Sequence, residues 1–308
     1  MLKIKLPRAS RSLPLFSLVL ALLAVACAGG GGQAGHEEAP PEQTPEQHTE
    51  AMAKEHEGDT PEASPATVPE PAVPVVTESV VYGSVDGAEL TGYLARPESG
   101  GEGLPGLIVI QEWWGLNENI EAMARRLAGE GYVALAVDLY GGEVGTTRDE
   151  ARALATAARE NPDGLDANLR AAYAYLEGQG APRIGSIGWC FGGGLSLRTA
   201  QLYPQELDAA IIYYGRVVTD PDELSPLAVP ILGLFGSEDQ GIPLDTVKAF
   251  EAALGELGKE ATIHVYEGAD HAFANPSGTR YDAAAADQAW AATQEFLAKH
   301  LKAEAGPA

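Results

Sequence analysis

The chain has 308 residues and a formal net charge of −24, with 44 acidic against 20 basic residues. So acidic a chain is a poor partner for nucleic acid, because contact with phosphates requires a basic groove or patch. The length fits one domain of ordinary size preceded by an extension. The two cysteines, Cys27 and Cys190, allow at most one disulfide within the chain.

Residues 1–27 predict an export signal. Four basic residues precede an apolar stretch over residues 13–26, which is shorter than the roughly 20 residues of a membrane-spanning helix. The stretch ends in Ala24-Val25-Ala26-Cys27, which is similar to a bacterial lipobox. We therefore expect lipidation of Cys27 and an exported protein of the cell envelope, anchored to the bacterial membrane. The alternative is an ordinary cleaved signal peptide and a periplasmic or secreted protein.

Residues 28–76 predict a disordered linker. Glu and Pro are frequent there, and no apolar periodicity indicates a buried face. Three histidines lie in this stretch, His36, His48 and His56, without the spacing of a metal site. We expect them to be solvated polar residues and expect no metal.

Residues 77–303 predict one α/β domain, followed by a short tail over residues 304–308. The expected strands cover residues 80–85, 88–95, 107–110, 132–137, 183–187, 207–213, 229–235 and 261–266. The expected helices cover residues 118–129, 147–159, 165–177, 195–202, 244–257 and 283–301. After an initial hairpin the elements alternate, which indicates a mostly parallel sheet with helices on both faces.

The segment Gly188-Trp189-Cys190-Phe191-Gly192-Gly193 has the pattern of a nucleophile elbow, with cysteine in place of the more usual serine. It joins an expected strand to an expected helix, and its glycines permit the sharp turn that exposes a nucleophile. The alternative is a glycine-rich turn that carries an inert, buried cysteine.

Two further residues complete a candidate triad in the chain order of alpha/beta hydrolases. Asp239 follows the strand at residues 229–235, and His271 follows the strand at residues 261–266. Glu238 is the rival acid, but it is expected to point to the opposite side of the strand end. Cys190 would attack a carbonyl carbon, His271 would move the proton, and Asp239 would orient the imidazole.

An oxyanion requires two fixed N–H donors. The backbone N–H of Phe191 is expected to supply one, and the Trp113 N–H, in the loop after the strand at residues 107–110, is expected to supply the other. Trp114 is expected to line the substrate pocket.

Several motifs together resemble the dienelactone hydrolase family over residues 78–303. They are Gln111-Glu112-x-x-Gly-x-Asn, Asp138-Leu139-Tyr140, Gly-x-Cys-x-Gly-Gly, Tyr213-Tyr214-Gly215, Gly-x-x-Asp and Tyr266-Glu267-x-x-x-His271-x-Phe273. The resemblance implies that Glu112 contacts the resting thiol and keeps it protonated until substrate arrives. A thiol that is activated only on demand would also survive longer under oxidising conditions. Tyr140 and Tyr214 are further candidate pocket residues.

Two positions depart from the family pattern. Gly142 and Asn275 stand where the resemblance implies arginines that hold a substrate carboxylate. Their loss argues against a small anionic lactone as substrate. Arg216 and Arg280 lie nearby in sequence and could substitute for them.

The sequence thus predicts a hydrolase of carboxylic esters or lactones, similar to carboxymethylenebutenolidase, that forms a thioester on Cys190. No cofactor is implied, and we expect a monomer that acts on small molecules. An acyl-transferase or peptidase on the same elbow, or a lipoprotein that binds ligands without catalysis, are the alternatives.

Overall fold

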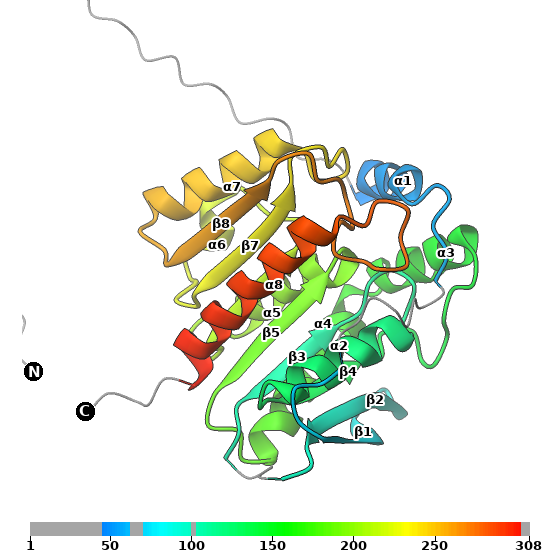
Figure 1. Ribbon diagram of the computed structural model, residues 1–308, viewed down its shortest axis with the longest axis vertical. Helices are drawn as coiled ribbons and strands as arrows, with labels where there is room; N and C mark the ends of the chain where they lie inside the picture. The colour runs from blue at the N-terminus through cyan, green and yellow to red at the C-terminus, as the bar shows by residue number, and fades with distance from the viewer. Residues whose placement is uncertain (1–44, 62–69, 100–102, 303–308) are drawn as a thin grey trace, which may run out of the picture. The chain divides into compact units, whose positions relative to one another are not determined.

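A sheet of eight strands organises the part of the chain that a computed structural model describes, residues 45–61, 70–99 and 103–302 (Figure 1). In space the strands follow the order β1-β2-β4-β3-β5-β6-β7-β8. The pairs β1–β2 and β2–β4 are antiparallel, and every other neighbouring pair is parallel. The strands are β1 (Val75–Val85), β2 (Ala88–Pro97), β3 (Gly106–Ile110), β4 (Val133–Val137), β5 (Ile184–Trp189), β6 (Ala209–Tyr213), β7 (Ile231–Gly236) and β8 (Ala261–Tyr266).

Helices cover both faces of this sheet. They are α1 (Pro45–Glu55), α2 (Glu118–Gly129), α3 (Arg148–Arg159), α4 (Pro162–Gly178), α5 (Phe191–Leu202), α6 (Pro221–Leu224), α7 (Leu244–Glu256), α8 (Ala283–Leu297) and the π-helical turn η1 (Ala298–Lys302). Side chains that alternate along β3 enter two different cores, since Val109 packs with α2 and α8 while Ile108 packs with α4, α5 and α7. The predicted α/β class and the mostly parallel sheet are confirmed.

Local sequence explains where several elements begin and turn. Asn117 caps α2 by accepting a hydrogen bond from the Ile120 N–H, and Thr147 forms a capping box with Glu150 at α3. Helix α4 begins at Pro162, three residues earlier than expected, because proline is tolerated in the first turn. Helix α5 begins directly after Cys190, whereas the sequence predicted its start at residue 195. Gly192 and Gly193 therefore lie in the first turn of the helix and not before it.

Residues 45–61 fall within the segment that was expected to be a disordered linker, but the structure has a helix there. Helix α1 occupies residues Pro45–Glu55, and Met52 and Ala53 are buried in the core that also contains α2 and α8. The helix starts at a proline and is followed by Gly58 in the left-handed region (φ 89°). This arrangement of proline at the start and glycine past the end is typical of a helix. Cys27, His36 and the expected export signal lie outside the described residues.

Within the described residues, none of the helices has the length and apolar character that crossing a membrane requires.

Candidate active site

The turn between β5 and α5 places Cys190 at the carboxyl edge of the sheet. Cys190 has φ 54° and ψ −113°, a strained backbone conformation for a residue with a side chain. A Cβ on Gly188 would lie 2.1 Å from the Gly192 carbonyl oxygen, and one on Gly192 would lie 2.4 Å from the Ile110 oxygen. Glycine is therefore required at both positions, and the turn has the geometry expected of an elbow.

His271 and Asp239 form a buried pair at the ends of β8 and β7. The His271 Nδ1 lies 2.8 Å from Asp239 Oδ2, and both side chains are fully buried. Asp239 Oδ1 accepts hydrogen bonds from the N–H groups of Gly241 and Ile242, each at 2.8 Å. Glu238 is exposed and bonds to Ser237. Asp239 thus holds its place through the loop backbone and is available to orient the imidazole.

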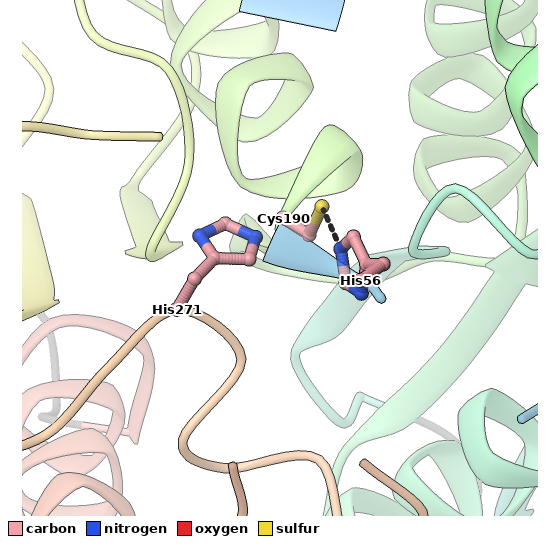
Figure 2. A group of neighbouring side chains, drawn as sticks. All are labelled: His56, Cys190 and His271. Carbon is pink, nitrogen blue, oxygen red and sulfur yellow. Dashed lines mark hydrogen bonds between the residues drawn. The ribbon is translucent and has the colours of Figure 1, made fainter. Parts of the chain in front are cut away.

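The Cys190 sulfur lies between two histidines, His271 and His56, as Figure 2 shows. The Sγ atom and one ring nitrogen of each histidine lie within 4.8 Å of one another. Burial alone would raise the pKa of the Cys190 thiol, but the positive charges of His271 and then His56 lower that pKa to about 5. The site therefore favours a thiolate paired with an imidazolium.

The pKa of His271 is shifted by the same charge pair in the opposite direction. Burial would lower the pKa of His271, but the negative charges of Asp239 and of the Cys190 thiolate raise it well above its usual value. Its Nε2 atom has no hydrogen-bond partner among the described residues, which leaves it free to face a reacting group.

Glu112 lies at the end of β3, deep in the site. The resemblance implied a contact with the resting thiol, but its carboxyl group accepts hydrogen bonds from the Tyr214 hydroxyl (3.3 Å) and from the Asn275 amide (2.6 Å). Burial and then the charge of the Cys190 thiolate raise the pKa of Glu112 to about 7. Glu112 is thus coupled to the nucleophile through charge.

The two residues expected to form the oxyanion hole follow the carboxyl ends of β5 and β3. Phe191 begins α5 directly after Cys190, and Trp113 follows β3, with 2 % of its surface exposed. The Trp113 carbonyl accepts a hydrogen bond from the Tyr140 hydroxyl at 3.2 Å, so Tyr140 holds this loop in place. The indole N–H groups of Trp113 and Trp114 are buried and have no partner among the described residues.

A cavity of about 340 Å³ opens beside the nucleophile. Cys190, Phe191, Arg159 and Arg216 contribute to its wall, and α4 and α5 supply most of the rest. The three residues expected to line the pocket, Trp114, Tyr140 and Tyr214, are not among those that line this cavity.

Of the two arginines that could replace the missing anion-binding pair, the structure brings only Arg216 to the cavity wall. Arg280 instead donates to the His271 carbonyl (3.1 Å) and to Asp59 (3.0 Å). Gly142 is exposed, and the Asn275 amide donates a hydrogen bond to Glu112. The cavity wall also contains Arg159, which lies over the Phe191 ring at 4.9 Å, and Arg198, which is paired with Asp166.

Sequence reasoning missed His56 in this site. Its ring is fully buried, stacks on Trp113 with centroids 4.4 Å apart, and places Nε2 3.7 Å from the Cys190 sulfur. The available signal was the run Glu55-His56-Glu57-Gly58-Asp59 after an apolar Ala-Met-Ala turn, which indicates a capped helix end.

Histidine and cysteine are also donors that zinc accepts. However, the arrangement serves a nucleophile equally well, and we assign no metal to it.

Comparison with known proteins fits this geometry. Residues 90–301 match the Dienelactone hydrolase family. The protein belongs to the dienelactone hydrolase family. It is 32 % identical to a "Putative carboxymethylenebutenolidase" of Saccharolobus solfataricus, over 73 % of this chain and all of the relative. It is 34 % identical to "Protein usf" of Aquifex pyrophilus, over 70 % of this chain and 96 % of the relative.

A solved structure agrees with these sequence relatives. A crystal structure titled "Putative Dienelactone Hydrolase" from Klebsiella pneumoniae is 30 % identical, with a TM-score of 0.62, and covers 73 % of this chain and 99 % of its own. The predicted family resemblance is confirmed, and the protein is a hydrolase of this family.

Proposed function

We propose that the protein hydrolyses carboxylic esters or lactones through a Cys190–His271–Asp239 triad and a thioester intermediate. The observation that carries the proposal is the strained elbow that presents Cys190 to an imidazole whose other nitrogen is bonded to a buried carboxylate. An inert buried cysteine needs neither that backbone strain nor a charged partner.

The chemistry follows the usual order for a thiol nucleophile. The Cys190 thiolate, whose proton resides on a histidine, forms a bond to the carbonyl carbon, and the carbonyl electrons move to oxygen. The backbone N–H of Phe191 and the Trp113 N–H are our candidates to stabilise that oxyanion. Collapse breaks the carbon–oxygen bond, the leaving alcohol takes the proton, and water then hydrolyses the thioester.

The cavity suggests which esters fit. The arginines Arg159, Arg198 and Arg216 outnumber the carboxylates Asp166 and Glu223 in the cavity wall, so the missing arginines at Gly142 and Asn275 do not exclude acidic substrates. We expect a carboxylated aryl ester to be cleaved with a lower KM than the matching neutral ester, and Arg216→Gln to remove the difference. Equal KM values for both esters with the parent protein would contradict this expectation.

The test of the proposed function uses the full chain with p-nitrophenyl acetate and simple lactones. Cys190→Ala and His271→Ala should each abolish turnover, while Glu57→Gln, at an exposed position, should leave it unchanged. Turnover that survives in Cys190→Ala would overturn the mechanism. Adding amines, alcohols and peptides separates hydrolysis from acyl transfer and peptidase activity, and ligand binding without any turnover would favour a non-catalytic lipoprotein.

The cellular setting remains our proposal as well. The protein is exported, lipidated on Cys27 and monomeric in this proposal, and the lipobox-like sequence before Cys27 supports the export and the lipidation. Mass spectrometry of the mature N-terminus should find a lipid-modified cysteine, absent in Cys27→Ser, and sedimentation should give the mass of one chain. An unmodified N-terminus would contradict the anchor.

A further inference from the structure

The segment of residues 45–61 reaches the nucleophile from outside the region that matches the family. Helix α1 ends at Glu55, and the backbone N–H of the next residue, His56, donates to the Met52 carbonyl at 3.1 Å. The His56 ring turns inward. Met52 packs so closely on Gly241 that a Cβ there would lie 1.6 Å from the Met52 Cε. The Gly241 N–H donates to Asp239 Oδ1 at 2.8 Å, so the segment packs against the loop that carries the catalytic acid.

Asp59 fixes the orientation of His56. Its Oδ2 atom lies 2.8 Å from the His56 Nδ1 and also accepts from Arg280 at 3.0 Å. Its Oδ1 atom accepts from the backbone and the hydroxyl of Thr279, at 2.8 and 2.7 Å. A carboxylate with these donors stays ionised, so the proton between it and the ring belongs to His56 Nδ1. The opposite nitrogen, Nε2, then faces the Cys190 sulfur.

Arg280 joins the two histidines. Its Nε donates to the His271 carbonyl, and its Nη2 donates to Asp59. The two imidazoles meet edge to face, with centroids 5.2 Å apart. The segment therefore places a carboxylate–histidine pair, Asp59 and His56, on one side of the sulfur, as Asp239 and His271 do on the other. Figure 2 shows the two imidazoles on either side of Cys190.

A purely structural role explains this arrangement poorly. Apolar contacts of Met52 and Ala53 already attach the segment to the core. Burying an imidazole and a carboxylate adds a desolvation penalty that packing alone does not require. Access to the sulfur also remains open, since Cys190 still lines the cavity with Arg159 and Arg216.

We infer that His56, oriented by Asp59, is a second catalytic histidine that exchanges a proton with Cys190, supplied by the segment of residues 45–61. This inference rests on the proposed function, because it assigns His56 a step of the same reaction.

The two histidines can divide the reaction between them. In acylation the electron pair of the Cys190 thiolate forms the carbon–sulfur bond, while the proton that the thiol has given up resides on His56 Nε2. When the ester carbon–oxygen bond breaks, the leaving alkoxide takes that proton from His56, which becomes neutral again. In deacylation water gives a proton to His271 Nε2 as its oxygen bonds to the carbonyl carbon. The carbon–sulfur bond then breaks, and the sulfur passes the proton from His271 on to His56, which restores the resting thiolate–imidazolium pair.

The experiment compares His56→Gln and His56→Ala with the parent full chain and with Glu57→Gln as the matched control. Glutamine occupies the space beside Trp113 but cannot accept the thiol proton. The first readout is the pH dependence of Cys190 alkylation by iodoacetamide, assigned by peptide mass so that Cys27 does not interfere. The second is the pre-steady-state burst of p-nitrophenol, which reports acylation.

We expect both His56 variants to shift the alkylation profile to higher pH and to slow the burst by about ten- to a hundredfold, as for loss of a general acid–base group. Glu57→Gln should leave both unchanged. Melting curves that match the parent establish that the variants are folded, and His56→Gln keeps the test valid if His56→Ala unfolds.

Three results would overturn the inference. An unchanged alkylation profile would leave His56 a packing residue. Faster alkylation and faster hydrolysis in both variants would make the segment an inhibitory plug. Activity lost in EDTA and restored by zinc would make His56 a metal ligand. Alkylation needs no turnover, so its profile tests His56 even if Cys190→Ala shows that the proposed hydrolysis fails.

Discussion

Two carboxylate–histidine pairs converge on one sulfur, and they are built in different ways. Asp239 and His271 follow β7 and β8, adjacent parallel strands whose register fixes both loops. Asp59 and His56 lie three residues apart in one turn after α1, and Thr279 and Arg280 connect that turn to the domain. The first pair is positioned by the sheet, whereas the second is positioned by the turn that follows α1. The two histidines that face the sulfur are therefore positioned by different kinds of structure: strand ends for His271 and a single turn for His56.

The largest difference should come from removing each carboxylate in turn. Asp239→Asn should lower kcat by on the order of 10³–10⁴-fold, because the wrong imidazole tautomer then faces the sulfur. Asp59→Asn should lower the acylation rate by about ten- to a hundredfold, because His271 can still serve as the base. Single-turnover kinetics with p-nitrophenyl acetate measure both. Equal losses would show that the two pairs act as one unit.

Glu112 lies near both histidines, and its titration should affect stability. Its pKa is about 7 in the folded protein and about 4.5 when unfolded, so only the unfolded state releases this proton between those values. The free energy of unfolding should therefore fall as pH rises from about 4.5 to about 7, by about 3 kcal/mol in total. Glu112→Gln should flatten this decline, and urea denaturation at several pH values measures it. A parallel decline in the parent and in Glu112→Gln would contradict the assignment.

The weaker support of the second pair can be tested at Met52. Met52→Ala should remove about 2 kcal/mol of the packing that docks α1, while the β7–β8 loops keep theirs. Hydrogen exchange of the amides at residues 52–59 should accelerate by roughly thirtyfold, with little change around Asp239. Uniform acceleration across both regions would mean that the two pairs open together.

Arg280 gives the smallest and most selective test. Arg280→Lys should keep the positive charge but lose the fork that bonds the His271 carbonyl and Asp59 together. We expect a several-fold slower acylation burst and an unchanged deacylation rate. Slower deacylation alone would place the effect on His271 instead.

Most of the fold and one of the two histidine pairs were predictable from sequence, for a physical reason. Apolar runs mark buried parallel strands, and the carboxyl ends of such strands meet at one edge, so Cys190, Asp239 and His271 could be expected together. His56 lies 134 residues from Cys190, in an acidic stretch whose apolar face is a single turn. A helix that short is stabilised by tertiary contacts, here Met52 against Gly241, which composition does not reveal.

The bonds of Glu112 were also beyond sequence reasoning. Its link to Tyr214 depends on the unusual backbone of that tyrosine, which has φ 36°, and its link to Asn275 depends on the loop after His271. Neither geometry follows from residue type. Motif spacing brought these residues to one site but did not determine which atoms pair.

The region that matches the family does not include every residue that contacts the nucleophile. The family match begins at residue 90, whereas His56 and β1 (Val75–Val85) precede it. A chain shortened to the matched region would keep the elbow, His271 and Asp239, and sequence comparison would still recognise it as a complete hydrolase. It would nevertheless lack the edge strand β1 and the histidine, His56, that contacts the Cys190 sulfur. Rates measured on such a fragment would describe a different catalyst.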